Sequence, residues 1–423
     1  MNKNTKQFLK KFKFVRKMHQ ELIGQYLEER QIGVNIDEIT PLKAKQAKFN
    51  EQKVRINILV PTLRKNQVFG GISTAIKFFE ALCAEGDFNK RIITTDSDVQ
   101  PEDIEGYMGA HIVSMEKDSK AYFQIVGCND RGMTDLNVRE NDIFIATSWW
   151  SAYILKPLIT WQNETYGTKH KMIYLIQDYE PGFYPWSSRY LLADSTYGNE
   201  VPTIAVFNTS ILKEYFSING YQFDHEFYFE PVLNEALGKH LEEAKKTARK
   251  RQLIVYGRPG VDRNCFEIIV GSLRELLHIC DEAREWEFLS LGEFHKEIDL
   301  GYDKRLVSKG KVTLSEYAKI MSESSVGLSL MNSPHPSYPP LEMSTFGVKT
   351  VTNTYANKDL SGFNQNLISV NHCSYENVAK ALKDLVSQYS SHSETSRNES
   401  YTGKKDPFNG IIKEISELIK NIN

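Results

Sequence analysis

Long apolar runs are absent from this sequence, and so are the usual signatures of secreted and zinc-binding proteins. No stretch approaches the roughly 18 to 20 consecutive apolar residues of a membrane-spanning helix. The five cysteines are widely spaced and include no Cys-x-x-Cys pair, which argues against a structural zinc site and a disulfide framework. The first residues lack the apolar core and small-residue cleavage site of a signal peptide, so a cytoplasmic protein is expected.

An overall excess of charge is missing too, but the charge is unevenly distributed. Lys and Arg number 52 against 54 Asp and Glu, and the net charge of −2 argues against a nucleic-acid-binding protein. Residues 1–17 contain seven of the cations and no acid, which leaves −9 on the rest of the chain. In a helix, one face would carry the apolar residues Phe8, Phe12, Val15, Met18 and Leu22. The lysines of the segment would lie on the opposite face.

Two interpretations of this basic segment are open. Residues 1–21 can lie as a peripheral helix on the anionic inner face of the plasma membrane, where each basic residue contributes ~1 kcal/mol. Alternatively, the apolar face packs on the protein itself and the lysines point into solvent. Under both interpretations, residues 1–53 are expected to be a basic amphipathic helical extension.

Beyond this extension, short apolar runs alternate with helical patterns. The first set has strand-like runs at 56–63, 91–95, 142–147, 172–177 and 203–207, with helical patterns at 73–84, 149–161 and 210–219. After a charged helical stretch, the second set has strand-like runs at 253–256, 286–291, 326–330 and 349–352, with helical patterns at 264–279, 315–322 and 341–346.

Two such arrays in succession predict an α/β protein with two doubly wound Rossmann-like domains facing a cleft. The predicted domains are residues 54–234 and 252–406, with a linker over 235–251 and a closing helix over 407–423. The polar segment 387–406 is expected to be a loop. The cleft at the carboxyl ends of the strands is the expected ligand site.

A glycine pair leads into the first helix of the first array, in the order Phe69-Gly70-Gly71-Ile72-Ser73. Glycines there let backbone amides approach an anionic ligand at a helix N-terminus. The full Gly-x-Gly-x-x-Gly pattern is missing, so NAD binding is not supported. The alternative for Gly70 and Gly71 is a plain tight turn.

Two arginines follow the first strand of the second array, in the stretch Tyr256–Asn264. Arg258 and Arg263 place two permanent cations five residues apart at the ligand edge of the sheet. Guanidinium groups at that position are suited to bidentate contact with a diphosphate. The alternative is a surface turn that happens to carry two arginines.

A proline-rich stretch precedes a later helix, in the order Ser333-Pro-His-Pro-Ser-Tyr338-Pro-Pro-Leu-Glu342. Two prolines suit the first turn of a helix, whose free amides then point toward the cleft. Tyr338 and Glu342 are candidate residues for binding a ligand in the cleft. The Glu342 carboxylate could accept a hydrogen bond from a sugar hydroxyl. The alternative for Glu342 is an acid favoured by the helix dipole, and His335 alone is more often structural than catalytic.

These three motifs together resemble the retaining GT-B glycosyltransferases over roughly residues 55–385. In that family a Gly-Arg is followed five positions later by Lys, and both cations grip the donor diphosphate; Gly257-Arg258 matches, and Arg263 replaces the Lys. Glu342 matches the second of two glutamates eight positions apart, which binds the nucleotide ribose, whereas the first falls on Pro334.

The stretch Gln177-Asp178-Tyr179-Glu180-Pro181 and the doublet Trp149-Trp150 look most like bacterial rhamnan-synthesis rhamnosyltransferases. That resemblance implies transfer of L-rhamnose from dTDP-L-rhamnose to a surface glycan, lipid-linked in some systems, with retention and without metal or other cofactor. It implies that Asp178 orients the acceptor hydroxyl or takes its proton; a turn-capping acid is the alternative.

Further residues are assigned to the same cleft by their expected positions. Gly292, Glu293 and Leu314 are expected near the nucleotide base. Gly292 and Glu293 follow the predicted strand at 286–291, Leu314 precedes the predicted helix at 315–322, and both places should border the cleft. Trp149 and Trp150 are expected near the acceptor, since aromatic faces stack on sugar C–H surfaces, although a place in the core is equally open.

Other functions share parts of this pattern. Asp96-Ser97-Asp98 has the spacing with which GT-A enzymes hold a divalent cation, but the pattern around it lacks other GT-A features. A nucleotide-sugar epimerase of GT-B architecture would act without an acceptor. A catalytically inactive glycan-binding protein would release no nucleotide.

Overall fold

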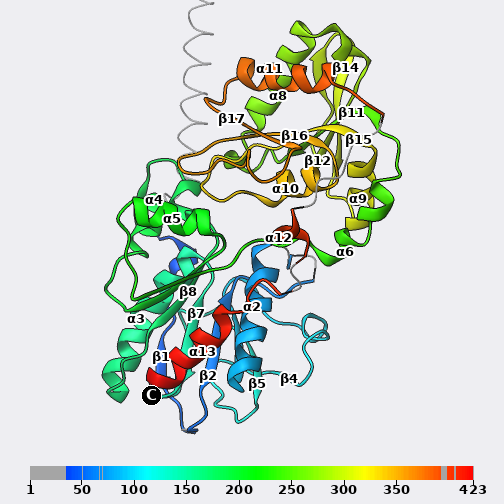
Figure 1. Ribbon diagram of the computed structural model, residues 1–423. Coiled ribbons are helices and arrows are strands. Elements are labelled where there is room, and N and C mark those ends of the chain that lie inside the picture. Colours follow the sequence, from blue (N-terminus) through cyan, green and yellow to red (C-terminus); the bar gives the residue numbers. More distant parts are fainter. Residues whose placement is uncertain are drawn as a thin grey trace, which may run out of the picture. The chain divides into compact units, whose positions relative to one another are not determined.

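The computed structural model describes residues 35–49, 51–65, 67–68, 70–391, 398–403 and 406–422 (Figure 1). The basic helix predicted for residues 1–21 lies outside the described residues. The chain divides into two compact units, residues 1–41 and 42–423. The described part of the first unit contains one short 3-10 helix, η1 (Asp37–Ile39). No helix among the described residues is both long and apolar enough to span a membrane.

The second unit contains two large, mainly parallel sheets, and the first has eight strands in the order β10-β9-β8-β7-β2-β3-β5-β4. All of its neighbouring strands are parallel. The strands are β2 (Arg55–Val60), β3 (Asn89–Thr94), β4 (Ala110–Ile112), β5 (Phe123–Gly127), β7 (Asp142–Ala146), β8 (Met172–Ile176), β9 (Thr203–Phe207) and β10 (His225–Tyr228). A separate pair joins β1 (Ala44–Gln46) to β6 (Leu136–Val138).

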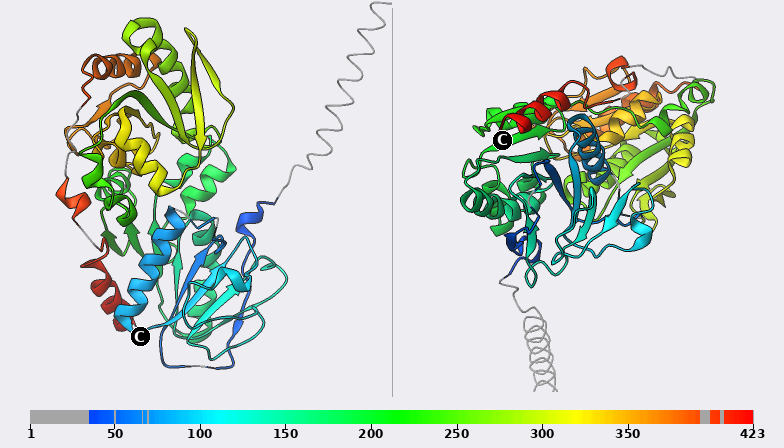
Figure 2. Two further views of the ribbon diagram at one scale, coloured as in Figure 1. Left: turned by 90° about the vertical axis from the view of Figure 1, so that its right-hand side faces the viewer. Right: turned by 90° about the horizontal axis from the view of Figure 1, so that it is seen from below.

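Helices cover both faces of this sheet because its strands are buried on both sides. They are α2 (Gly71–Gly86), α3 (Trp149–Tyr166), α4 (Ser188–Ser195) and α5 (Ser210–Ile218). One apolar cluster contains residues of α3 and α5, and a second contains residues of α2. The last helix, α13 (Ile411–Ile422), packs on α2 within that second cluster, and both views in Figure 2 show the two helices together. The closing helix therefore belongs to the core of the first sheet.

The second sheet has seven strands in the order β13-β14-β12-β11-β15-β16-β17. Only the edge pair of β13 (Ile298–Gly301) and β14 (Lys304–Gly310) is antiparallel. The others are β11 (Lys250–Gly257), β12 (Glu287–Gly292), β15 (Ser324–Leu328), β16 (Lys349–Asn353) and β17 (Leu367–Val370). The helices are α6 (Glu235–Gly238), α7 (Leu241–Ala244), α8 (Phe266–Ile279), α9 (Leu314–Glu323), α10 (Tyr338–Thr345), α11 (Tyr375–Ser387) and α12 (Glu399–Thr402).

The predicted α/β class with two Rossmann-like sheets is confirmed. The expected linker holds α6 and α7, but β11 already begins at Lys250. The polar segment expected to be a loop contains the short helix α12. The sequence patterns missed the buried strand β5, the short or partly exposed strands at the sheet edges, and the helices α4 and α11.

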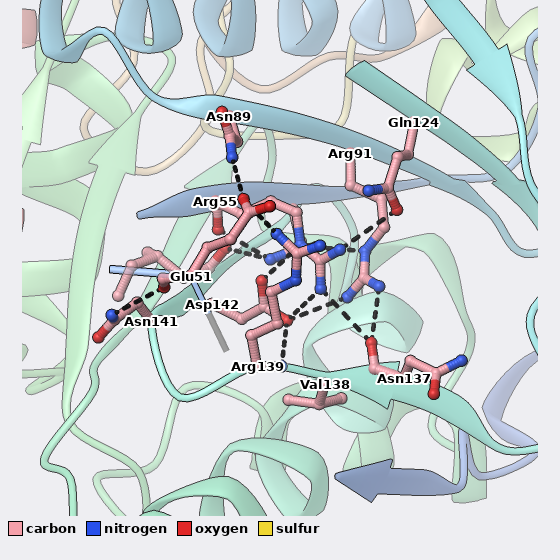
Figure 3. Close-up of polar contacts among 12 residues, drawn as sticks. Glu51, Arg55, Asn89, Arg91, Gln124, Asn137, Val138, Arg139, Asn141 and Asp142 are labelled. Atoms are coloured by element: carbon pink, nitrogen blue, oxygen red, sulfur yellow. Dashed lines mark hydrogen bonds and ion pairs between the residues drawn. The ribbon is translucent and has the colours of Figure 1, made fainter. Parts of the chain in front are cut away.

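A buried ionic network ties three strands together at their amino ends, away from the ligand edge (Figure 3). Arg55 donates to both carboxylate oxygens of Asp142 at 2.7 Å, and Arg91 lies 3.3 Å from one of them. The backbone nitrogen of Arg139 also donates to Asp142, at 2.8 Å. Burial opposes ionisation of Asp142, but the two guanidinium groups outweigh it and lower its pKa to about 2.

Replacing Asp142 with Ala is expected to lower the free energy of unfolding by about 3–5 kcal/mol, because it leaves two guanidinium groups buried without their carboxylate. Urea denaturation followed by circular dichroism measures this loss. The control is Glu105→Ala, which breaks an exposed pair with Lys65 and should shift the midpoint little. Equal midpoint shifts in the two variants would contradict a structural role for the network.

Candidate active site

Asp178 lies just past the carboxyl end of β8, and its side chain joins the two sheets. The residue is only 6% exposed. One carboxylate oxygen accepts hydrogen bonds from the Ser333 hydroxyl and from the Tyr179 backbone nitrogen, the latter at 2.8 Å. The other oxygen lies 3.7 Å from Nε of Arg263. Asp178 is therefore the point at which loops of both sheets meet.

Arg263 belongs to the turn before α8 and is held on three sides. Its guanidinium lies 4.2 Å from the ring centroid of Phe183, a cation–π contact, besides its ion pair with Asp178. Its carbonyl accepts from the backbone nitrogen of Asn332 at 2.7 Å. The structure thus brings together two residues that the sequence predicted separately for the site.

Arg258, the other predicted diphosphate ligand, is half-exposed at the end of β11. Its guanidinium has no hydrogen-bond or ion-pair partner in the part of the chain that the structure describes. A permanent cation left unpaired at the carboxyl edge of a sheet is free to bind an anionic ligand.

The loop that carries Arg258 packs closely on the end of β12. Gly257 and Gly292 are opposite each other in the sheet, and Gly292 has a φ of 123°. A Cβ on Gly292 would lie 3.0 Å from the Gly257 carbonyl oxygen, so this close approach requires glycine. Glu293 accepts from the Gly260 nitrogen at 2.8 Å, so its carboxylate supports the arginine loop. Its predicted contact with the base stays a prediction.

The segment between β15 and α10 is fixed by hydrogen bonds to side chains. His335 donates its backbone N–H to the Ser333 hydroxyl oxygen at 3.0 Å. Ser337 has a φ of 68°, in the left-handed region, which costs about 1–3 kcal/mol for a residue other than glycine. Tyr338 reaches Asn208, beyond β9, at 3.4 Å. This strained turn sets the position of the N-terminus of α10.

His335 is a neutral hydrogen-bond donor beside this cluster. Burial lowers its pKa to about 4, against an opposing effect of the Asp178 charge. Its Nδ1 accepts from the Ser337 nitrogen at 3.0 Å, which places the ring proton on Nε2. Nε2 is buried and has no partner within the described residues.

Lys358 is a buried cation that the sequence motifs did not indicate. It is 0% exposed, and the Met331 carbonyl, at 2.7 Å, is the one acceptor of its ammonium among the described residues. Burial lowers its pKa to about 8, while the charge of Asp178 opposes that shift. The available signal was its position a few residues beyond the predicted strand at 349–352.

Glu180 is a buried acid two residues beyond Asp178. Its carboxyl accepts from the Trp149 backbone nitrogen and so caps the first turn of α3. Burial raises its pKa to about 8; the Trp149 N–H opposes this shift and the Asp178 charge adds to it. Glu180 is therefore mostly protonated at neutral pH.

Replacing Glu180 with Gln is expected to stabilise the protein more at about pH 9 than at about pH 5. An acid whose pKa is raised on folding keeps its proton in the folded state, so stability falls as pH rises from the unfolded value toward about 8. Glutamine does not ionise and escapes that loss. Thermal melts of both proteins at the two pH values measure the difference, and a pH-independent difference would contradict the raised pKa.

Glu342, the predicted ribose ligand, lies in α10 and is part-buried. Burial raises its pKa to about 7, and the Tyr317 hydroxyl opposes the shift. Leu314 is exposed at the start of α9. The roles of Glu342, Tyr338 and Leu314 toward a donor stay predictions.

The glycine loop meets the Asp178 segment. Gly70 has a φ of 45° and precedes α2 without a side-chain cap. A Cβ on Gly71 would lie 3.0 Å from Oε1 of Gln177, the neighbour of Asp178. The N-terminus of α2 is thus next to the loop that follows β8.

The tryptophan doublet at the start of α3 does not present two faces to an acceptor. Trp149 is fully buried, and its indole nitrogen donates to the Tyr184 hydroxyl at 2.9 Å. Trp150 is half-buried. The structure therefore places Trp149 in the core. Asp96 and Asp98 are exposed beyond β3, on the first sheet.

Two family models match this chain, one over the region of each large sheet. Models of the N-terminal and C-terminal domains of WsaF match residues 55–210 and 251–383, which together are more than half of the chain. The chain belongs to the WsaF family. The predicted resemblance to GT-B glycosyltransferases of bacterial glycan synthesis is thereby confirmed.

A curated relative is the O-antigen biosynthesis protein RfbC of Myxococcus xanthus, which is 32% identical over 212 residues. The match covers 50% of this WsaF-family chain but 15% of RfbC.

Solved structures share the GT-B fold at low identity. Sucrose-phosphate synthase of Thermosynechococcus elongatus has a TM-score of 0.53 at 9% identity, over 88% of this chain and 99% of that one. The catalytic domain of Arabidopsis thaliana starch synthase IV has a TM-score of 0.53 at 10% identity, with the same coverage. S. aureus TarM has a TM-score of 0.52 at 10% identity, over 87% and 98% of the two chains.

Proposed function

We propose that this WsaF-family glycosyltransferase transfers L-rhamnose from dTDP-L-rhamnose to a growing surface glycan, with retention and without a metal ion. WsaF is a rhamnosyltransferase of S-layer glycan synthesis, and RfbC is named for O-antigen biosynthesis. The observation that carries the proposal is the meeting of Asp178 and Arg263 at the carboxyl ends of strands from both sheets. It supports an active site built from both halves of the chain.

The charges at this site suit an anionic leaving group. Arg263 and the buried Lys358 are two cations beside the single carboxylate of Asp178, because His335 is neutral and Glu180 is protonated at neutral pH. The unpaired guanidinium of Arg258 adds a third cation. Glycosyl transfer requires stabilisation of the departing diphosphate beside an oxocarbenium-like sugar, and preorganised cations supply it.

Asp178 is the proposed partner of the acceptor. Its carboxylate can orient the attacking hydroxyl or take its proton as that hydroxyl bonds to the anomeric carbon. The hydrogen bond from the Tyr179 nitrogen also fits a turn-capping acid. The opposite carboxylate oxygen, which faces Arg263, takes no part in that turn.

Chelation of divalent metal with EDTA is expected to leave the rate of transfer unchanged, because Arg258 and Arg263 would stabilise the diphosphate in place of a cation. The measurement is rhamnosyl transfer after dialysis against EDTA, with and without added manganese. Strong inhibition that manganese reverses would favour a metal held by Asp96 and Asp98 instead.

The donor and the reaction class are tested together by nucleotide release. The protein is incubated with dTDP-rhamnose, UDP-glucose and GDP-mannose, each with and without a rhamnose-terminated oligosaccharide. The proposal expects dTDP release from dTDP-rhamnose that depends on the acceptor. An epimerase would convert a UDP-sugar without acceptor, and an inactive glycan-binding protein would release no nucleotide.

A further inference from the structure

Trp186 is the one exposed tryptophan of this protein, and all five tryptophans lie within the described residues. The residue is 95% exposed, whereas the other four tryptophans are buried or half-buried. An indole in that position buries almost no surface on folding, so packing does not account for it.

The indole lies parallel to a second ring. Trp186 and Tyr190 have ring centroids 5.9 Å apart and an interplanar angle of 2°. Ser187, the N-cap of α4, accepts from the backbone nitrogen of Tyr190 and so fixes the turn between them. Leu191, the next residue along α4, is also exposed. We call Trp186, Tyr190 and Leu191 the aromatic platform.

The base of the platform is anchored by hydroxyl groups. The Tyr190 hydroxyl lies 3.2 Å from that of Tyr179, which lies 3.1 Å from the Tyr221 hydroxyl. Tyr179 also donates to Asp194 at 3.2 Å. A ring held at its hydroxyl loses little further freedom on binding a ligand, which favours affinity.

A short segment of the chain connects the platform to the proposed active site. Only seven residues separate Trp186 from Asp178, and that connection is fixed at several points. Phe183 lies under the Arg263 guanidinium at 4.2 Å, and the Tyr184 hydroxyl accepts from Trp149 at 2.9 Å. A glycan whose end reacts at Asp178 would extend along the segment that carries the exposed indole of Trp186.

We propose that the aromatic platform binds the acceptor glycan, with the C–H face of a pyranose ring stacked on Trp186. The proposal rests on the proposed function and assigns its acceptor site to this segment. A flat, amphipathic ring surface next to hydroxyl groups matches a sugar, which has an apolar face and a polar rim. A protein or membrane partner would favour a larger contiguous apolar patch.

The test compares Trp186→Ala with Trp186→Phe and with Met108→Ala, which removes another highly exposed apolar side chain of the same half of the protein. The acceptor is a soluble rhamnose trisaccharide, and the donor is dTDP-rhamnose. Trp186→Ala is expected to raise the KM for the trisaccharide about tenfold, with a change of less than about twofold in the KM for the donor. Trp186→Phe should recover most of the loss, and Met108→Ala should behave as the parent protein.

Trisaccharide binding is also followed by tryptophan fluorescence, which needs no catalysis. The platform predicts a saturable change in the parent protein that disappears in Trp186→Ala. If no donor is turned over but this change is present, the proposed function fails and the platform stands. An unchanged KM and an unchanged fluorescence response in Trp186→Ala would overturn the proposed glycan site. Binding of both proteins to anionic phosphatidylglycerol vesicles is measured as well, and a loss of vesicle binding alone in Trp186→Ala would also overturn it.

Discussion

Replacing Arg258 with Ala is expected to lower the rate of rhamnosyl transfer about a hundred- to a thousand-fold, the usual cost of about 2.7–4 kcal/mol for removing one preorganised group that stabilises transition-state charge. Arg258 lies at the carboxyl end of β11, and its guanidinium is free of partners among the described residues. Its removal therefore breaks no ion pair of the described structure and leaves the fold intact. Initial rates with dTDP-rhamnose and a rhamnose-terminated acceptor measure the effect.

The same strand offers a matched control. Arg251 lies near the amino end of β11, where it is exposed and paired with Glu285. Arg251→Ala removes one positive charge from the opposite end of the same strand. It should leave the rate close to that of the parent protein. Similar rate losses in both variants would show that overall charge, rather than a diphosphate site at Arg258, determines activity.

Replacing Asp178 with Asn is expected to lower transfer by about a hundred- to ten-thousand-fold, the range for losing a group that moves a proton in the transition state. Asparagine keeps the size of the side chain and can still accept from Ser333 and from the Tyr179 nitrogen. It loses the charge that faces Arg263. The measurement is again the initial rate, with the thermal midpoint recorded to exclude unfolding.

Glu180→Gln separates an effect of Asp178 from a general effect of removing a carboxyl at this site. Glu180 is protonated at neutral pH and accepts from the Trp149 backbone, a bond that glutamine can keep. Its substitution is therefore expected to cost far less activity at about pH 7 than that of Asp178. Unchanged turnover in Asp178→Asn would remove Asp178 from the chemistry and leave it a turn-capping acid.

Most of the buried strands were predictable because parallel strands covered on both faces are continuous apolar runs, whereas the buried β5, which contains Gln124, was missed. The run at 203–207 is β9 as predicted. The edge hairpin of β13 and β14 was missed, since its partly exposed strands carry lysine, arginine and aspartate and show no apolar run. Strands of three residues, such as β4 and β6, give too short a pattern for any periodicity to be detected.

The candidate site was predictable only where a local motif marked it. Arg258 and Arg263 were identified by their position after a strand, whereas the contact of Arg263 with Asp178 joins residues 85 positions apart. No motif indicated Lys358, because its burial depends on the packing of distant segments. The tryptophans illustrate the same limit. The doublet Trp149-Trp150 was predicted near the acceptor because it stands out in the sequence, but the fold buries Trp149 and exposes Trp186.

The central claim is retaining transfer of rhamnose to a glycan, and the structure of the product tests it most directly. The protein is incubated with dTDP-L-rhamnose and a rhamnose trisaccharide, and the product is analysed by mass spectrometry and by NMR of the new anomeric centre. We predict one added deoxyhexose whose anomeric configuration is that of the donor. An inverted configuration, or release of dTDP with the trisaccharide unchanged, would contradict the account.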